Sequence, residues 1–125
     1  MKITAELLCA KGACTDQIAL FRKFYPKGKN VTLAACLRHA ARFKWRWATL
    51  NLLSEPAQKA CIKEIDTALE AYAKASLAAW KASGKASGAA WTAAAWKARD
   101  KVLATALVAY YKASATAFAR AALSE

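Results

Sequence analysis

The sequence predicts an all-α protein in which three to four short N-terminal helices pack against a long antiparallel helical hairpin. Alanine, the strongest helix former, supplies 34 of the 125 residues. The chain has only four glycines and two prolines, too few for the many turns of a β-sandwich or barrel. Apolar residues recur at spacings of three and four through most of the chain, which is the period of an amphipathic helix.

We divide the chain into a basic N-terminal helical region, 1–54, and an Ala-rich helical hairpin, 55–125, which together form one compact unit. A chain of this length buries about 65–70% of its unfolded surface, so it can hold a core without staples. It lacks both a run of about 18 strongly apolar residues and the apolar stretch of a signal peptide. We therefore expect no membrane span and a cytoplasmic location.

Two short helices are expected before the first turn of the chain. Thr4 is the candidate N-cap of a helix over 4–11, and Gly12 ends that helix. A second helix runs from about 14 to 25, and residues 26–30 (Pro-Lys-Gly-Lys-Asn) form a turn. The buried stripe of the second helix consists of Ile18, Phe21 and Tyr25.

The next stretch predicts a third helix and a bend into a fourth. Thr32 is the candidate cap of the third helix. Its expected inner face consists of Cys36, Leu37, Ala40 and Phe43. Residues 44–47 (Lys-Trp-Arg-Trp) alternate like a strand but are too short and isolated to pair, so we expect a bend that leads into a helix over 48–53.

Two long helices are expected in the second half. The first begins at Ser54-Glu55-Pro56, where Ser caps and Pro suits the first turn, and it runs to about Ser83. Gly84 and Gly88 together cost about 2 kcal/mol inside a helix relative to Ala, so we expect a turn there and a last helix from about Ala89. The two expected inner stripes are Ile62, Ile65, Leu69, Tyr72, Ser76 and Trp80, then Trp96, Leu103, Leu107, Tyr110, Ser114 and Phe118. The alternative is one continuous helix that exposes its stripe unless it finds a partner.

Positive charge is concentrated in one window. The segment 22–46 carries +8 of the net charge of +12 and contains no acid. Arg38 and Arg42, four residues apart, would repel on a shared helix face, which a solvated surface or an anionic partner tolerates. We expect this surface to meet phosphates with a steep salt dependence, and Trp45 or Trp47 to stack on a base. The alternative is a solvated face with its aromatic residues in the core. The candidate partner-binding residues are Arg22, Lys23, Lys27, Lys29, Arg38, Arg42, Lys44, Arg46 and Trp45.

Residues for catalysis or metal binding are scarce. His39, the only histidine, forms a nominal Cys3His set with cysteines whose spacing is too irregular for zinc, so we expect a half-exposed helical His. The default role of the cysteines is that of small buried hydrophobes; they are Cys9, Cys14, Cys36 and Cys61. Acids at 64, 66 and 70 fit an ordinary helix surface, and no Gly-rich phosphate loop follows a strand. We expect no enzyme, no metal site and no cofactor.

Several short segments of the first 60 residues form a distinctive pattern: 1–8, 11–14, 16–17, 19–21, 31–32, 36–40, 43, 45, 47–48 and 51–53. They resemble the opening of a family of small phage and prophage proteins, in which an Ala-rich tail of aromatic repeats follows a Ser-x-Pro-Ala step, here Ser54-Glu55-Pro56-Ala57. The resemblance implies a phage origin and the host cytoplasm, and it carries no particular activity. Relatives tend to have acids around the paired Trp, where this chain has Lys44 and Arg46; the reversal implies a different partner or a binding surface elsewhere.

We therefore expect a small non-enzymatic phage-type protein that occupies nucleic acid or a host nucleoprotein defence complex through a basic helical surface, as an anti-CRISPR inhibitor would. The alternative is a structural or assembly protein that self-associates through its aromatic helix stripes. Either a monomer or a homodimer is consistent with the sequence. A membrane-surface role is a third possibility, because the last helix carries Trp, Tyr and Lys in an Ala background.

Overall fold

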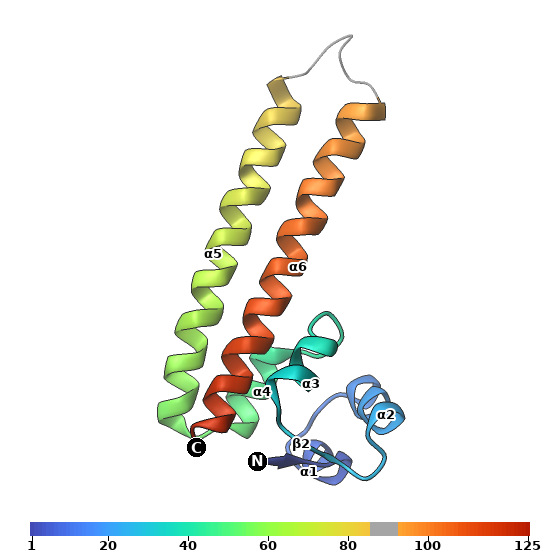
Figure 1. Ribbon diagram of the computed structural model, residues 1–125, viewed down its shortest axis with the longest axis vertical. Helices are drawn as coiled ribbons and strands as arrows, with labels where there is room; N and C mark the ends of the chain where they lie inside the picture. Colours follow the sequence, from blue (N-terminus) through green and yellow to red (C-terminus); the bar gives the residue numbers. More distant parts are fainter. Residues whose placement is uncertain (86–92) are drawn as a thin grey trace.

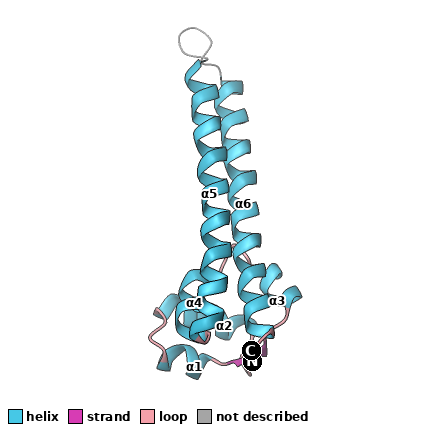
Figure 2. Ribbon diagram, turned by 90° about the vertical axis from the view of Figure 1, so that its left-hand side faces the viewer, coloured by secondary structure: helices cyan, strands magenta, loops and turns pink. Residues whose placement is uncertain are grey.

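The computed structural model, which describes residues 1–85 and 93–125, confirms the all-α class (Figure 1). The elements of the described residues are β1 (Lys2–Ile3), α1 (Ala5–Ala10), α2 (Thr15–Phe24), β2 (Lys29–Asn30), α3 (Leu33–Arg38), α4 (Trp45–Leu52), α5 (Glu55–Lys85) and α6 (Ala93–Leu123). The long pair α5 and α6, here called the arm, rises from a base formed by residues 1–54 (Figures 1 and 2).

The helix α1 begins and ends where the sequence predicts, and α3 begins where it predicts. Thr4 Oγ1 accepts a hydrogen bond from the backbone N–H of Leu7 at 3.1 Å and caps α1. Thr32 Oγ1 accepts one from the N–H of Ala35, also at 3.1 Å, and caps α3. Gly12 follows α1 with a φ of 80°, the left-handed conformation that favours glycine at a helix end.

The two short strands were not predicted. Lys2 pairs with Asn30 and Ile3 with Lys29 in an antiparallel ladder. Gly28 makes this close approach possible, because its φ is 84° and a Cβ there would lie 2.9 Å from the carbonyl oxygen of Ile3. The pairing fixes the turn after α2, which carries two of the candidate basic residues, against the start of the chain.

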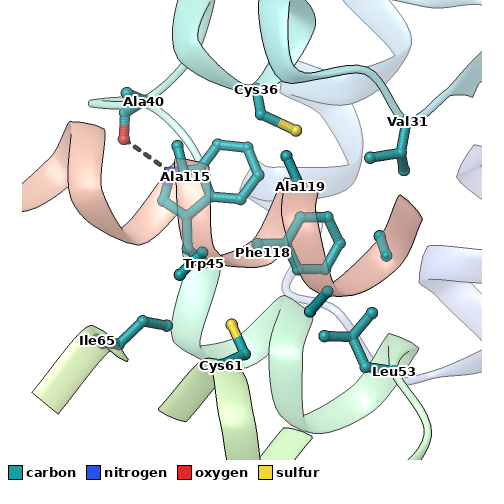
Figure 3. Packing of buried hydrophobic residues seen from close by; sticks show 13 residues of the cluster. Val31, Cys36, Ala40, Trp45, Leu53, Cys61, Ile65, Ala115, Phe118 and Ala119 are labelled. Carbon is teal, nitrogen blue, oxygen red and sulfur yellow. Dashed lines mark hydrogen bonds between the residues drawn. The ribbon is translucent and has the colours of Figure 1, made fainter. Parts of the chain in front are cut away.

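The expected extension of the third helix was wrong, because α3 ends at Arg38. The carbonyl oxygen of Ala40 accepts a hydrogen bond from the indole N–H of Trp45 at 2.8 Å (Figure 3). In a continuing helix that oxygen would accept from the amide of Lys44, which instead donates to the side-chain oxygen of Gln17 at 3.1 Å. The chain therefore turns over residues 39–43 before α4 begins. Leu37, expected inside, is exposed.

The expected antiparallel hairpin is confirmed, since α5 and α6 pack side by side along the arm (Figures 1 and 2). The start signal at Ser54 is also confirmed, because α5 begins at Glu55. A single continuous helix is thereby excluded. The turn was expected to include Gly84, but this residue lies within α5, near its last residue Lys85. Gly88 and the expected helix start at Ala89 lie outside the described residues.

The main core lies where the lower end of the arm meets the base (Figure 3). Its largest fully buried side chains are Phe118, Ile65, Thr49 and Cys61. The Phe118 ring lies 5.5 Å from the Trp45 ring, between centroids, so α6 packs directly on α4. Burying one such ring contributes about 1.5–3 kcal/mol. The core therefore draws on both the 1–54 and the 55–125 regions.

The upper arm consists of two helices with no third layer in the described residues. Trp80 and Trp96, expected on the inner stripes, are 53% and 45% exposed, and Leu69 of the first stripe is also exposed. The guanidinium carbon of Arg99 lies 4.2 Å and 4.0 Å from the ring centroids of Trp80 and Trp96, so a cation joins α5 to α6 there.

By length and composition alone, the segment Trp96–Leu123 could cross a membrane. Core helices of proteins without a membrane span meet the same criterion. The lower part of this segment packs in the core through Phe118 and the small residues around it, so the expectation of no membrane span is compatible with the fold.

Candidate functional site

The basic side chains of the 22–46 window are all exposed. Arg46 is neutralised by Asp66 of α5 at an N···O distance of 2.7 Å, and both side chains are about half exposed. An exposed pair of this kind contributes about 0–1 kcal/mol. The other seven cations form no ion pair with an acid within residues 1–85 and 93–125. Their charge is therefore open to an external partner.

Three of these cations are held on two aromatic rings at the end of α2. Lys23 Nζ lies 5.9 Å from the ring centroid of Phe24, and Arg42 Cζ lies 5.2 Å from the same centroid. Lys29 Nζ lies 5.7 Å from the ring centroid of Tyr25. Each cation–π contact contributes about 0.5–1 kcal/mol at an exposed site. Residues from α2, β2 and the turn after α3 thus place their charges around one aromatic surface.

His39 lies beneath these cations and was wrongly expected to be half exposed. Its ring is buried, with its centroid 4.4 Å from that of Phe24 and its Nε2 3.0 Å from the hydroxyl of Tyr25. Burial lowers the pKa of His39 below its ordinary value of 6.5, and the charges of Arg42 and Arg38 lower it further. The imidazole is therefore neutral at pH 7. We call Lys23, Lys29, Arg38 and Arg42 the basic cluster.

Gln17 fixes the backbone of the turn that carries Arg42 and Lys44. Its side-chain NH2 donates to the carbonyl oxygen of Arg42 at 3.2 Å, and its side-chain oxygen accepts from the N–H of Lys44 at 3.1 Å. One amide from α2 thus satisfies two backbone groups that no helix satisfies. Gln17 positions the cluster, and no pattern in the sequence singles it out.

The proposed stacking role of Trp45 is contradicted by its burial. Trp45 is only 8% exposed, and its ring centroid lies 6.0 Å from Phe43 and 5.5 Å from Phe118. Its indole N–H is used by Ala40, as Figure 3 shows. A base therefore has no access to this ring. Trp47 is only partly buried, but it packs against a second apolar cluster, whose buried residues are Ala5, Leu8 and Phe21 of α1 and α2.

The remaining candidate residues are exposed but do not join the basic cluster. Lys44 Nζ lies 3.9 Å from the sulfur of Cys14 rather than over a ring of the cluster. Arg46 faces α5 through its ion pair. Arg22 and Lys27 make no ring contact in the described part of the chain. The window thus divides into a cluster of four cations and four more dispersed ones.

An apolar cavity of about 80 Å³ lies under the cluster, with Tyr25, His39 and Phe43 among its walls.

Two cysteines, Cys36 and Cys61, are buried as expected, and burial raises the pKa of Cys36 to about 11. The other two, Cys9 and Cys14, are exposed, contrary to expectation. No three His, Cys, Asp or Glu side chains come together among the described residues in a way that could hold a metal.

Comparison with known protein families, with curated proteins and with solved structures found no match for this chain. The resemblance to phage proteins therefore stays a prediction, and the function has to be inferred from the chain itself.

Proposed function

We propose that this chain is a non-enzymatic protein that binds the phosphates of nucleic acid, alone or within a host nucleoprotein complex, through the basic cluster. The observation that carries the proposal is the placement of three exposed cations, Lys23, Lys29 and Arg42, on the rings of Phe24 and Tyr25, with no ion pair to an acid of the described residues. Phosphate contacts by Lys and Arg release counterions from nucleic acid and dominate sequence-independent affinity.

The arrangement favours binding because folding already restricts the cationic side chains, so less of their conformational entropy is lost when they bind a phosphate. Cations held on rings lose less rotamer freedom on meeting a phosphate than free surface side chains do. Arg42 is doubly constrained, since Gln17 holds its backbone and Phe24 its side chain. The charges of Arg42 and Arg38 both lower the pKa of His39, so both act near its ring, and an anion bound there would offset this positive charge.

A narrower form of the proposal is a phage inhibitor of a host nucleoprotein defence complex, comparable to an anti-CRISPR protein. The resemblance of its first 60 residues to phage proteins supports this form. The basic cluster would then occupy a groove that normally holds phosphates.

The test compares two variants that each lose three positive charges. The cluster variant carries Lys29→Gln, Arg38→Gln and Arg42→Gln; the control variant carries Lys63→Gln, Lys74→Gln and Lys81→Gln. We expect the cluster variant to bind labelled DNA or RNA at least tenfold more weakly, with a salt slope reduced by about 2–3, because each lost phosphate contact removes about 0.7–0.9 from the slope. The measurement is fluorescence anisotropy at several salt concentrations.

The control variant separates a local contact from net charge. Its three lysines are exposed on α5. Each stands two positions, or about 200° around the helix, from a residue that faces α6 or the core, so each points away from the packed side. Equal losses in the two variants would mean that only overall charge matters, and the basic cluster would then be rejected as the site. Binding that is absent in the unmodified protein even at low salt would reject the function itself.

A second candidate function is self-association through the arm. The half-exposed side chains of Leu77, Trp80 and Trp96 favour it, because two packed helices leave this apolar area in water. Against it, residues 70–112 contain seven Lys and Arg and only two acids, so two arms would repel each other. The mass in solution, by light scattering or sedimentation, distinguishes a monomer from a defined oligomer.

A further inference from the structure

The side of α6 that packs on α3 at the base carries a row of lysines higher up the arm. Ala115 and Ala119 are fully buried on the side of α6 that meets Cys36 of α3 (Figure 3). Lys97 precedes Ala115 by 18 residues, and Lys101 precedes Ala119 by 18. Eighteen residues are five full helical turns, so each lysine lies directly above an alanine that packs on the base.

A third lysine continues the row downward. Lys112 precedes Ala119 by seven residues, which is two turns less about 20°. Lys97, Lys101 and Lys112 are all exposed. They extend over sixteen residues of α6, and the fifteen steps from Lys97 to Lys112 rise about 22 Å at 1.5 Å per residue. We call these three residues the lysine row.

The charge of the lysine row is not cancelled by its own helix. The only acid in the sequence of α6 is Asp100, and it pairs with Arg99 at 3.2 Å. On α5, by contrast, Lys59 pairs with Glu55 and further acids stand at 64, 66 and 70. The positive side of the arm is therefore the side of α6, not that of α5.

The lysine row lies on the arm, and the basic cluster lies on the base from which the arm rises. In Figure 1, α6 stands between α5 and α3, and the base projects from the α6 side of the arm. The turn after α3 is tied to α6, because Ala40 is hydrogen-bonded to Trp45 and Trp45 packs on Phe118. In the sequence, Arg38 and Arg42 stand two positions before and two positions after Ala40. The arm and the base thus each carry exposed cations, and the turn that bears Arg42 adjoins the part of the base that packs on α6.

We propose that the corner between the arm and the base binds a nucleic-acid duplex by its phosphate backbone, with the lysine row on one wall and the basic cluster on the other. This inference rests on the proposed function and names its substrate class. Cations on two walls suit a rod whose charges face several directions, and duplex DNA presents one charge per about 1.7 Å of its axis. A single strand is usually held by stacking on exposed rings, and beside the basic cluster Trp45 is buried while cations lie over Phe24 and Tyr25.

The experiment compares a duplex of random sequence with a single strand of the same length. The row variant carries Lys97→Gln, Lys101→Gln and Lys112→Gln, and the cluster and control variants defined above are measured beside it. We expect the unmodified protein to bind the duplex more tightly than the single strand. We expect the row variant to lose at least tenfold in duplex affinity and the control variant less than twofold. Thermal unfolding followed by circular dichroism checks that all variants fold alike.

The outcomes separate the two proposals. Suppose that the cluster variant loses duplex affinity, while the row variant and the control variant both bind the duplex as tightly as the unmodified protein does. The duplex corner is then overturned and the proposed function stands. Tighter binding of the single strand also overturns the corner. If the unmodified protein binds neither nucleic acid at low salt, the proposed function falls as well.

Discussion

At His39, burial and two neighbouring arginines act in the same direction, because each disfavours the charged imidazole. Well above pH 6.5, neither the folded nor the unfolded chain binds a proton there. Below that pH the unfolded chain binds one first, since the folded pKa is lower. The free energy of unfolding therefore decreases as the pH falls below 6.5 and levels off below the folded pKa.

We predict this acid destabilisation and its loss in His39→Asn. Urea unfolding between about pH 5 and pH 7.5 measures it, and each unit of pKa difference corresponds to about 1.4 kcal/mol. NMR titration of the only histidine measures the same pKa directly, and a bound duplex should raise it by offsetting the charges of Arg38 and Arg42. A pKa at or above 6.5 in the free protein would contradict the burial argument.

At the residue scale, the sequence predicted what is decided within one helical turn. Thr4 and Thr32 cap helices through N–H groups three residues away, so their role can be inferred locally. Gln17 acts across 25 and 27 residues, and Trp45 packs on a ring from the far end of the chain. Nothing local distinguishes a residue with such a contact from an ordinary surface glutamine or an exposed tryptophan.

At the scale of elements, the arm could be predicted because its helices are long and their start and periodicity agree. The expected inner stripes were correct low on the arm, at Ile65 and Phe118, and wrong at Trp80 and Trp96. Periodicity identifies a face but not what covers it. The base covers the lower face, whereas above it only the opposite helix is present among the described residues.

Arg99 joins the two helices of the upper arm. Its side chain is 8% exposed between the rings of Trp80 and Trp96, and its Nε and Nη1 have no hydrogen-bond acceptor. We predict that Arg99→Lys destabilises the upper arm by about 1–3 kcal/mol, since an ammonium cannot stack on two indoles as the planar guanidinium does. Arg99→Met should cost less, because a thioether packs well on aromatic rings and has no donor.

Amide hydrogen exchange along α5 and α6 measures this effect, with the base as an internal reference. Protection should fall in the upper arm of Arg99→Lys and remain unchanged around Phe118. A larger loss in Arg99→Met than in Arg99→Lys would show that charge, rather than stacking, joins the two helices.

At the scale of the whole molecule, the net charge of +12 was evident from the sequence, but its placement was not. The window 22–46 contributes the basic cluster, and the lysines of α6 were not among the candidate site residues. They stand more than 50 residues further along the chain, and only the antiparallel return of α6 brings their side of the helix toward the base. The corner is thus a product of the fold.

The two candidate functions predict opposite responses to salt. If five of the seven cations of the row and cluster meet phosphates, duplex affinity should fall by about 10²–10³-fold between about 50 and 200 mM salt. Self-association of two positively charged arms should instead strengthen with salt, because screening weakens their repulsion while apolar contacts persist. We predict a monomer at micromolar concentration and low salt by sedimentation. A defined oligomer whose stability rises with salt, together with weak and salt-insensitive duplex binding, would assign the exposed tryptophans to assembly and reject the phosphate-binding role.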